Sequence, residues 1–456
     1  MKKDHTTRMG TTNITKLLIS FSIPTIVGML VNALYNVVDR IFLGQVVGSN
    51  AIGGVYLAFP FMIIAMAFAM LIGFGGNALS SIELGRGNRE KSEAILNNSL
   101  VLLFFTGVAL SILMKIFMKP LLLLFGGSEG LLPYAESYLS VLVYFMPVHL
   151  VQFGLNAFTR GEGNPVISMG TTLIGAIVNT ILDYVFIVKW GWGVAGAAWA
   201  TGIGMTCSFL WVMQYFTIGS SNLKLHFPTK LEPSLILPSL RLGTSNFGMQ
   251  LVSSFITIVY NIKLQAYGGD FAVATMGIVQ SIAMLVFMPV IGLNQGAQPI
   301  MGYNYGARNY ARVRKTLRTA AFLATGYMTI MWATIELWPE SYISIFGSEG
   351  AGMDAMRFAV RAYYAMIPFT GSQIISASYF QATDQPALSL ATSLSRQFIF
   401  LLPLIYLFSA LWGLEGIWIA TAVADFLSFA VTMMLVKRDQ KRIDRLDALN
   451  LERASA

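Results

Sequence analysis

The chain has 456 residues, of which 55% are hydrophobic and only 11% are charged. A soluble domain carries about 25% charged residues, so this chain lacks the charge to cover a water-exposed surface. Its composition therefore excludes an ordinary soluble enzyme and a disordered protein, and its single cysteine, Cys207, excludes an internal disulfide. The composition predicts an integral membrane protein.

Long apolar segments occur along almost the whole chain. The first fifteen residues are polar, and the apolar segment after them is longer than the core of a signal peptide, so we expect a retained transmembrane helix there. A span needs roughly 20 mainly apolar residues. This criterion predicts an all-α protein with twelve transmembrane helices, at about 16–45, 50–80, 92–118, 130–157, 165–189, 192–217, 238–267, 270–301, 315–338, 352–381, 387–410 and 412–436.

The basic residues test this count. The segments on one side of the twelve predicted helices (the N-terminus, the loops at 84–91, 160 and 308–318, the link at 218–241 and the tail) hold 22 of the 30 Lys and Arg residues. By the positive-inside rule that side is the cytoplasm. We expect a multi-pass protein of the cell (inner) membrane with both termini cytoplasmic. The net charge of +8 is then explained by topology and contact with membrane lipid, without a nucleic-acid partner.

The chain is a tandem duplication, because similar residues recur in the same order in its two halves. Pro165 and Ser168 align with Pro386 and Ser389, and Gly75 aligns with Gly296. In the sixth span of each half, the segments 192–201 (WGVAGAAWAT) and 412–421 (WGLEGIWIAT) are identical at half of their positions.

Each repeat has an even number of spans, so the two halves insert with the same polarity. We expect two six-helix bundles related by a pseudo-twofold axis along the membrane normal. The expected parts are an N-terminal lobe at 1–217, a cytoplasmic linker at 218–237, a C-terminal lobe at 238–436 and a cytoplasmic tail at 437–456. Such halves favour transport by alternating access, and the alternative is a duplication that serves assembly alone.

Two acidic residues lie at similar depth in the N-terminal lobe, where a charge in hydrocarbon needs an explanation. Asp39 and Asp183 each precede the outer end of their span by about six residues, or ~9 Å. Each ends a polar stripe at helical spacing. The stripe in span one is Asn32, Tyr35, Asn36 and Asp39, and the stripe in span five is Ser168, Thr172, Asn179 and Asp183. We expect the two stripes to face each other and to form a cluster that binds substrate.

Two neighbouring buried carboxylates cannot easily both ionise, so such a cluster can load and release a proton. The alternatives are that Asp39 pairs with Arg40 or that both acids hold helices together. Pro24 interrupts the inner part of the same helix as Asp39, and we interpret it as a hinge.

The C-terminal lobe has fewer candidates for coupling. Asp425 lies near the middle of span twelve, and helix packing and a functional role are equally compatible with it. Arg396 is a candidate partner for Asp425, and we expect Lys263 to extend toward the membrane surface. The three histidines are scattered without metal-ligand spacing, and no P-loop occurs, so we expect no metal, no cofactor and no bound ATP. An ion gradient, of H+ or of Na+, is then the expected energy source.

The order of these features resembles the multidrug and toxic compound extrusion (MATE) transporters over about residues 10–440. The features are Pro24, Asp39, Asn179 with Asp183, Arg160-Gly-Glu-Gly-Asn-Pro165, Gln381-Ala-Thr-Asp-Gln-Pro386 and the repeated Trp-Gly-x-x-Gly. The resemblance implies export of amphipathic, often cationic small molecules in exchange for H+ or Na+. It is nearest to the DinF-like group, which implies that Asp39 is the main proton- and cation-binding residue with Asn179 and Asp183 as partners. The NorM-like group has acids in spans seven and ten, which this chain lacks.

The leading interpretation is a monomeric, proton-coupled multidrug exporter rather than an enzyme. The alternatives are a Na+-coupled exporter, a flippase for lipid-linked substrates, and an intramembrane transferase that uses Asp39 and Asp183.

Overall fold

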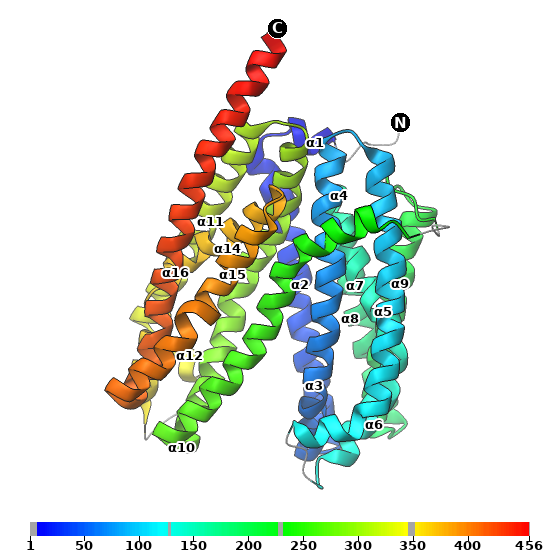
Figure 1. Cartoon of the computed structure of the whole chain (residues 1–456). Coiled ribbons are helices and arrows are strands. Elements are labelled where there is room, and N and C mark those ends of the chain that lie inside the picture. Colours follow the sequence, from blue (N-terminus) through cyan, green and yellow to red (C-terminus); the bar gives the residue numbers. More distant parts are fainter. Residues whose placement is uncertain (1–6, 126–128, 227–230, 345–351, 456) are drawn as a thin grey trace. The chain divides into compact units, whose positions relative to one another are not determined.

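The computed structural model describes residues 7–125, 129–226, 231–344 and 352–455, without the side chains of a few of these, Asn36 and Arg40 among them. The described chain is helical and contains no strand (Figure 1). Its first half consists of α1 Thr7–Thr11, α2 Ile14–Val46, α3 Ser49–Ala69, η1 Met70–Phe74, α4 Gly75–Gly85, α5 Arg89–Leu124, α6 Leu132–Leu142, η2 Val143–Phe145, α7 Met146–Gly161, α8 Pro165–Asp183, η3 Tyr184–Lys189 and α9 Gly193–Thr217. Its second half consists of α10 Pro233–Gly306, α11 Tyr310–Leu337, α12 Pro339–Ser344, α13 Met353–Tyr364, α14 Ile367–Ala382, α15 Pro386–Leu394, η4 Ser395–Leu401 and α16 Leu402–Ser455.

Ten helical stretches of the described chain are long and apolar enough to cross a membrane by length and composition. They cover the predicted spans with two differences. Predicted spans eleven and twelve form one stretch, Pro386–Ala448, which bends at Gly413. Predicted span ten is built from two shorter helices, α13 and α14, which are separated at residues 365–366. With these taken into account, each of the twelve predicted spans is helical, and the predicted all-α membrane fold is confirmed.

Positive-φ glycines support the internal duplication. Gly48 and Gly269 have φ angles of 111° and 60°, and they separate the first two spans of each repeat. Gly193 and Gly413 have φ angles of 56° and 58°, and they precede the sixth span of each repeat. The members of each pair occupy matching positions of the two repeats. Only glycine adopts such φ values without steric cost. Glycines at matching positions therefore allow the turns of the two repeats to have the same backbone geometry.

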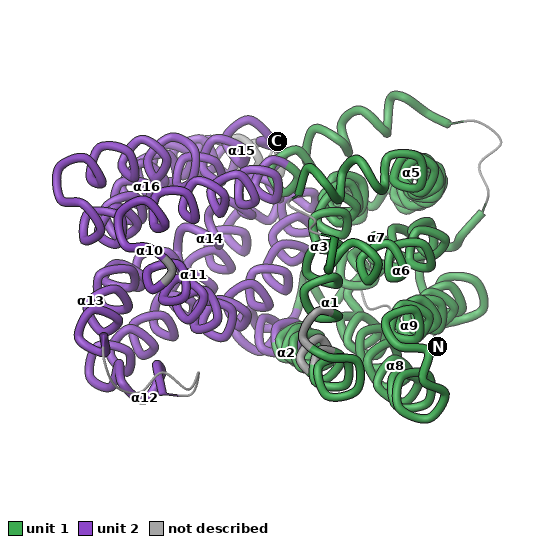
Figure 2. The backbone as a smooth tube through the Cα atoms, turned by 90° about the horizontal axis from the view of Figure 1, so that it is seen from below, with its two compact units in different colours: residues 1–11, 23–247 green, residues 12–22, 248–456 purple. Residues whose placement is uncertain are grey.

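Two compact units make up the chain, and Figure 2 colours them separately. Unit 1 takes residues 1–11 and 23–247, and unit 2 takes residues 12–22 and 248–456. Within unit 1, α8 packs along α9 and α5 packs along α7. Within unit 2, α14 packs on α11 and α16, and η4 packs on α16. Unit 1 therefore includes the first turns of α10, which is the first long helix of the second repeat. Unit 2 includes the first turns of α2, which is the first long helix of the first repeat.

Close glycine contacts explain how these first turns are held. In unit 1, a Cβ on Gly75 would lie 2.7 Å from the backbone nitrogen of Gly243, near the start of α10. In unit 2, a Cβ on Gly296 would lie 3.1 Å from the backbone nitrogen of Ser22, in the first turns of α2. The two contacts are equivalent in the duplication, because Gly75 corresponds to Gly296 and Ser22 corresponds to Gly243.

The segment after the last predicted span continues as helix. In Figure 1, α16 runs unbroken through the residues predicted as a tail, to Ser455. It is attached to the rest of unit 2 by Ile443, which is fully buried, and by Arg314 of α11, which donates to Asp447 at 2.7 Å. This segment is therefore an ordered part of unit 2 as far as it is described.

The Gly243 contact predicts a specific sensitivity to side-chain size. A Cβ at Gly243 would lie 1.8 Å from the carbonyl oxygen of Leu71, so Gly243→Ala should destabilise the protein by about 1–3 kcal/mol through overpacking. Gly277→Ala, in the part of α10 that follows Gly269, is the control, because its Cβ would meet nothing within 4 Å. Thermal unfolding in detergent measures both, and equal melting temperatures for the two variants would contradict the packing described.

Candidate functional site

The polar faces of α2 and α8 approach each other inside unit 1. Gly28 of α2 makes this possible, because a Cβ at that position would lie only 3.6 Å from Thr172 Oγ1 of α8. Further along both helices, the side chains of Asp39 and Asp183 are buried, with 8% and 0% of each residue exposed. Their carboxylates are close enough to interact electrostatically. The structure therefore brings together the two acids that the sequence singled out.

Asn179 connects Asp183 to the neighbouring helix α9. With its amide nitrogen facing the acid, Asn179 donates to Asp183 Oδ2 at 3.2 Å and accepts from the backbone N–H of Thr201 at 3.2 Å. This orientation is assigned from the hydrogen-bond pattern. Among the described residues, Oδ1 of Asp183 has no hydrogen-bond partner. A buried carboxylate oxygen without a donor is costly, so this atom is suited to hold a proton or to face a cation.

The other predicted site residues differ in how far they are buried. Tyr35 and Thr172 are partly buried, whereas Asn32 is exposed. The Thr172 hydroxyl donates to the carbonyl of Ser168 at 3.3 Å, within its own helix. The side chain of Asn36 lies outside the described residues. Pro24 lies inside α2, two residues beyond Ser22, where the helix passes from unit 2 to unit 1.

Two residues of the cluster were missed by the sequence reasoning. Tyr138 of α6 is buried, forms a side-chain hydrogen bond with Thr201, and lies in the field of Asp39, Asp183 and Tyr35. Thr201 was detectable, because it ends the motif that is repeated in the two halves. Tyr138 carries no comparable signal, since a tyrosine in an apolar span is usual.

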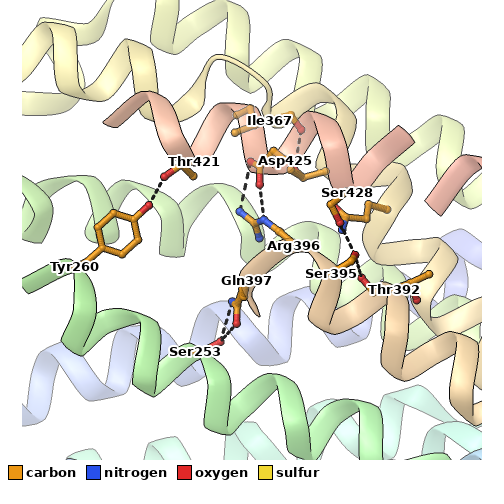
Figure 3. A network of polar contacts seen from close by, with 12 residues as sticks. Ser253, Tyr260, Ile367, Thr392, Ser395, Arg396, Gln397, Thr421, Asp425 and Ser428 are labelled. Atoms are coloured by element: carbon orange, nitrogen blue, oxygen red, sulfur yellow. Dashed lines mark hydrogen bonds and ion pairs between the residues drawn. The ribbon is translucent and has the colours of Figure 1, made fainter. Parts of the chain in front are cut away.

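In unit 2 the equivalent positions have different chemistry. Tyr260 occupies the position that corresponds to Asp39 in the duplication, and its hydroxyl is hydrogen-bonded to Thr421, the counterpart of Thr201 (Figure 3). The predicted partnership of Arg396 with Asp425 is confirmed, at 2.5 Å between Nε and Oδ1. Lys263 lies 4.3 Å from the ring centroid of Tyr406. Unit 2 therefore has a tyrosine where unit 1 has its first acid, and Asp425 of unit 2 is paired with a cation.

No group of three His, Cys, Asp or Glu side chains among the described residues is arranged to hold a metal ion. In that part of the chain, carboxylates, amides and hydroxyls supply the chemistry of the candidate site. Such groups can exchange a proton or a bound organic cation.

Another buried acid lies outside the membrane-spanning segments, in the loop that follows α7. Glu162 is 1% exposed, and its Oε2 accepts from the Ser221 hydroxyl at 2.7 Å and from the backbone N–H groups of Asn222 and Leu223 at 3.2 and 3.4 Å. Burial raises the pKa of Glu162 to about 7, against the opposing effect of these hydrogen bonds and one with Tyr215. Glu162 thus attaches the start of the linker to unit 1 and titrates near neutral pH.

This pKa predicts how stability depends on pH. Because the folded-state pKa of Glu162 is raised, the folded chain holds a proton that the unfolded chain has lost above its ordinary pKa, so stability falls as pH rises toward and through 7. Glu162→Gln imitates the protonated carboxyl and should flatten the dependence of melting temperature on pH between 5 and 8. The exposed Glu90→Gln is the control and should keep the wild-type slope. A wild-type slope in Glu162→Gln would contradict this assignment.

Comparisons with known proteins agree with this architecture. The MatE family model matches residues 24–185 and again 247–407, once in each repeat. The chain is 24% identical over 460 residues to the multidrug export protein MepA of Staphylococcus haemolyticus (strain JCSC1435), covering 99% of this chain and 100% of the relative. A solved structure of MATE in the bent conformation matches with a TM-score of 0.93 at 22% identity, over 98% of this chain and 100% of that one. Another, described as protein A, is 36% identical with a TM-score of 0.89, over 95% and 97%.

The match covers more than half of the chain, so the resemblance seen in the sequence is confirmed. The spans and the family together make this a multi-pass membrane protein, and members of the family are transporters rather than enzymes. The chain belongs to the MatE family of membrane transporters.

Proposed function

We propose that this chain is a secondary active exporter of amphipathic, cationic small molecules, and that protons flowing inward drive the export. We place it in the cell membrane with both termini in the cytoplasm. Two findings support the export of drugs or toxic compounds. The chain belongs to a transporter family, and a relative that it matches over nearly its whole length is named a multidrug export protein.

The carboxyl pair of unit 1 is the observation that carries the proposal. Asp39 and Asp183 are buried and interact with each other, and Asn179, Thr201 and Tyr138 surround them. Because Asp39 acts electrostatically on Asp183, two negative charges on this buried pair would repel each other. One proton relieves that repulsion, and so does one organic cation. Proton and substrate therefore compete for the same carboxylates, with Asp39 as the main binding residue.

The polar stripe extends this site toward a substrate. By their spacing in the sequence, Asn32, Tyr35 and Asn36 belong to the stripe that ends in Asp39. Thr172 lies on the side of α8 that approaches Gly28 of α2. An amphipathic cation needs one buried negative charge and a surface of mixed polarity beside it. We assign these residues to contacts with the uncharged part of the substrate. We favour H+ over Na+ as the coupling ion because a proton needs only one oxygen atom, such as Oδ1 of Asp183.

The hinge role that we assign to Pro24 follows from its place in the units. It lies directly after the point where α2 passes from unit 2 into unit 1, and proline removes a backbone hydrogen bond from a helix interior. A bend there would change the course of the helix that carries Asp39. Alternating access is then expected to couple the protonation of Asp39 to the conformation of α2.

The proposal predicts the outcome of transport in liposomes. With a pH gradient and no sodium, purified wild-type protein should move a fluorescent organic cation against its gradient. Asp39→Asn should reduce the rate to near the protein-free background, because an amide neither ionises nor releases a proton. Asp354→Asn is the control, since the side chain of Asp354 is 94% exposed in its ion pair with Arg357, and it should transport like wild type.

Three outcomes would contradict parts of the proposal. Transport that requires a sodium gradient would reject the proton. Full activity of Asp39→Asn would reject Asp39 as the binding residue. If neither gradient moves any of several cations, the flippase for lipid-linked substrates becomes the better interpretation.

A further inference from the structure

The end of α16 carries charges of both signs, and the structure separates them. The terminal segment, residues 437–447, has five basic and three acidic side chains, and it continues the helix beyond the last predicted span (Figure 1). Four of its bases are exposed and form no ion pair within the described part of the chain. They are Lys437, Arg438, Lys441 and Arg445.

The three acids of the terminal segment are instead paired with arginines of unit 2. Asp439 is buried, and its Oδ1 lies 2.7 Å from Nε of Arg442. Arg314 of α11 is bonded to both Asp444 and Asp447. The acids are therefore engaged inside unit 2, and the positive charges of the four exposed bases have no such partners.

The exposed bases continue an apolar face of the same helix. Leu427, Val431 and Met434 are exposed, Met434 to 67%. Arg438 and Lys441 follow Met434 at steps of four and three residues, the spacing that keeps side chains on one face of a helix. This face changes from apolar to basic between Met434 and Arg438. The last predicted span ends in the same interval, so the change falls where hydrocarbon gives way to headgroups.

The neighbouring helix α11 shows the same change. Lys315 and Arg318 are exposed near its start and form no ion pair among the described residues. Phe322, four residues beyond Arg318, is 76% exposed. The bonds of Arg314 to the terminal segment bring this part of α11 beside it. Two adjacent helices of unit 2 thus present exposed bases next to exposed apolar side chains.

We propose that this surface binds the headgroups of anionic phospholipids. Its bases, the basic face, are Lys315 and Arg318 of α11 and Lys437, Arg438, Lys441 and Arg445 of α16. Ammonium and guanidinium groups bind phosphate through charge-assisted hydrogen bonds. Several Lys and Arg residues directly beyond a transmembrane helix attract anionic lipid of the cytoplasmic leaflet. The site goes beyond the export proposal and depends only on the cytoplasmic placement of the C-terminus.

A phospholipid fits this surface better than a soluble anion does. A soluble anion would contact the bases and leave exposed apolar side chains such as Met434 and Phe322 without a partner, whereas the acyl chains of a lipid cover them. Long Lys and Arg side chains also reach from a helix end to the headgroups. The positive-inside rule requires bases on this side of the membrane but no particular face of a folded helix. The separation of bases from acids is thus an additional feature, which a headgroup site explains.

Lipid binding to the purified full-length chain tests the site. Native mass spectrometry in detergent measures the affinity for dioleoylphosphatidylglycerol and for dioleoylphosphatidylcholine, which has the same acyl chains and no net charge. Wild type should prefer the anionic lipid. The tail variant, Lys437→Gln/Arg438→Gln/Lys441→Gln/Arg445→Gln, should bind phosphatidylglycerol about tenfold more weakly, because even one base at an anionic headgroup contributes about fivefold. Its affinity for phosphatidylcholine should stay at the wild-type value.

A matched variant removes four bases from the same predicted side of the membrane. Arg8→Gln/Lys16→Gln/Lys224→Gln/Arg241→Gln changes exposed residues that form no ion pair within the described chain. It has the same net charge as the tail variant and should bind phosphatidylglycerol within about twofold of wild type. Glycerol 3-phosphate, which has the phosphate without acyl chains, should not displace the lipid from wild type at equal concentration.

Four results would overturn the site. They are the absence of a preference for the anionic lipid in wild type, wild-type affinity in the tail variant, an equal loss in both variants, and displacement by glycerol 3-phosphate. An equal loss would indicate overall charge, and displacement would indicate a site for soluble anions. Because all substituted residues are exposed, both variants should melt at the wild-type temperature. The assay measures binding without transport, so the lipid site and the export proposal fail separately.

Discussion

The cost of placing a charge in hydrocarbon governs this molecule. Each ionisable side chain at membrane depth must be neutralised, paired or reserved for a ligand. Asp425 is paired with Arg396, and Lys263 lies over the ring of Tyr406. Asp39 and Asp183 are instead buried near each other, an arrangement that a proton or a cation stabilises. The two units therefore solve the same problem in different ways, and under our proposal the solution in unit 1 leaves a site for an exchangeable positive charge.

The duplication makes this difference easy to trace. The repeats share turn glycines and the close packing of Gly75 and Gly296. The side-chain chemistry of the repeats differs at single positions. Asp39 of the first repeat corresponds to Tyr260 of the second, and the Tyr260 hydroxyl is hydrogen-bonded to Thr421. A shared scaffold has thus been given an acid in one half and a neutral phenol in the other. Under our proposal, the first half exchanges protons and binds the substrate cation.

Much of the fold could be predicted from the sequence, because apolar spans and basic loops follow directly from the physics of the bilayer. The approach of Asp39 to Asp183 could also be predicted, because each acid ends a polar stripe on its helix and both lie at a similar depth in the membrane. The place of Tyr138 in this cluster could not be predicted, because it depends on how α6 packs and not on the residues next to Tyr138 in the sequence. The same holds for Glu162, whose partners at residues 221–223 are far away along the chain. The helical extension of α16 to Ser455 depends on contacts with α11 that no local pattern reveals.

Proton release on substrate binding tests the central claim most directly. Calorimetry of an organic cation binding to purified protein, in buffers of different ionisation enthalpy, counts the protons released per bound cation. If the cation displaces a proton from the Asp39–Asp183 pair, the count for wild type is about one near neutral pH. Tight binding by wild type with no proton release would contradict the account.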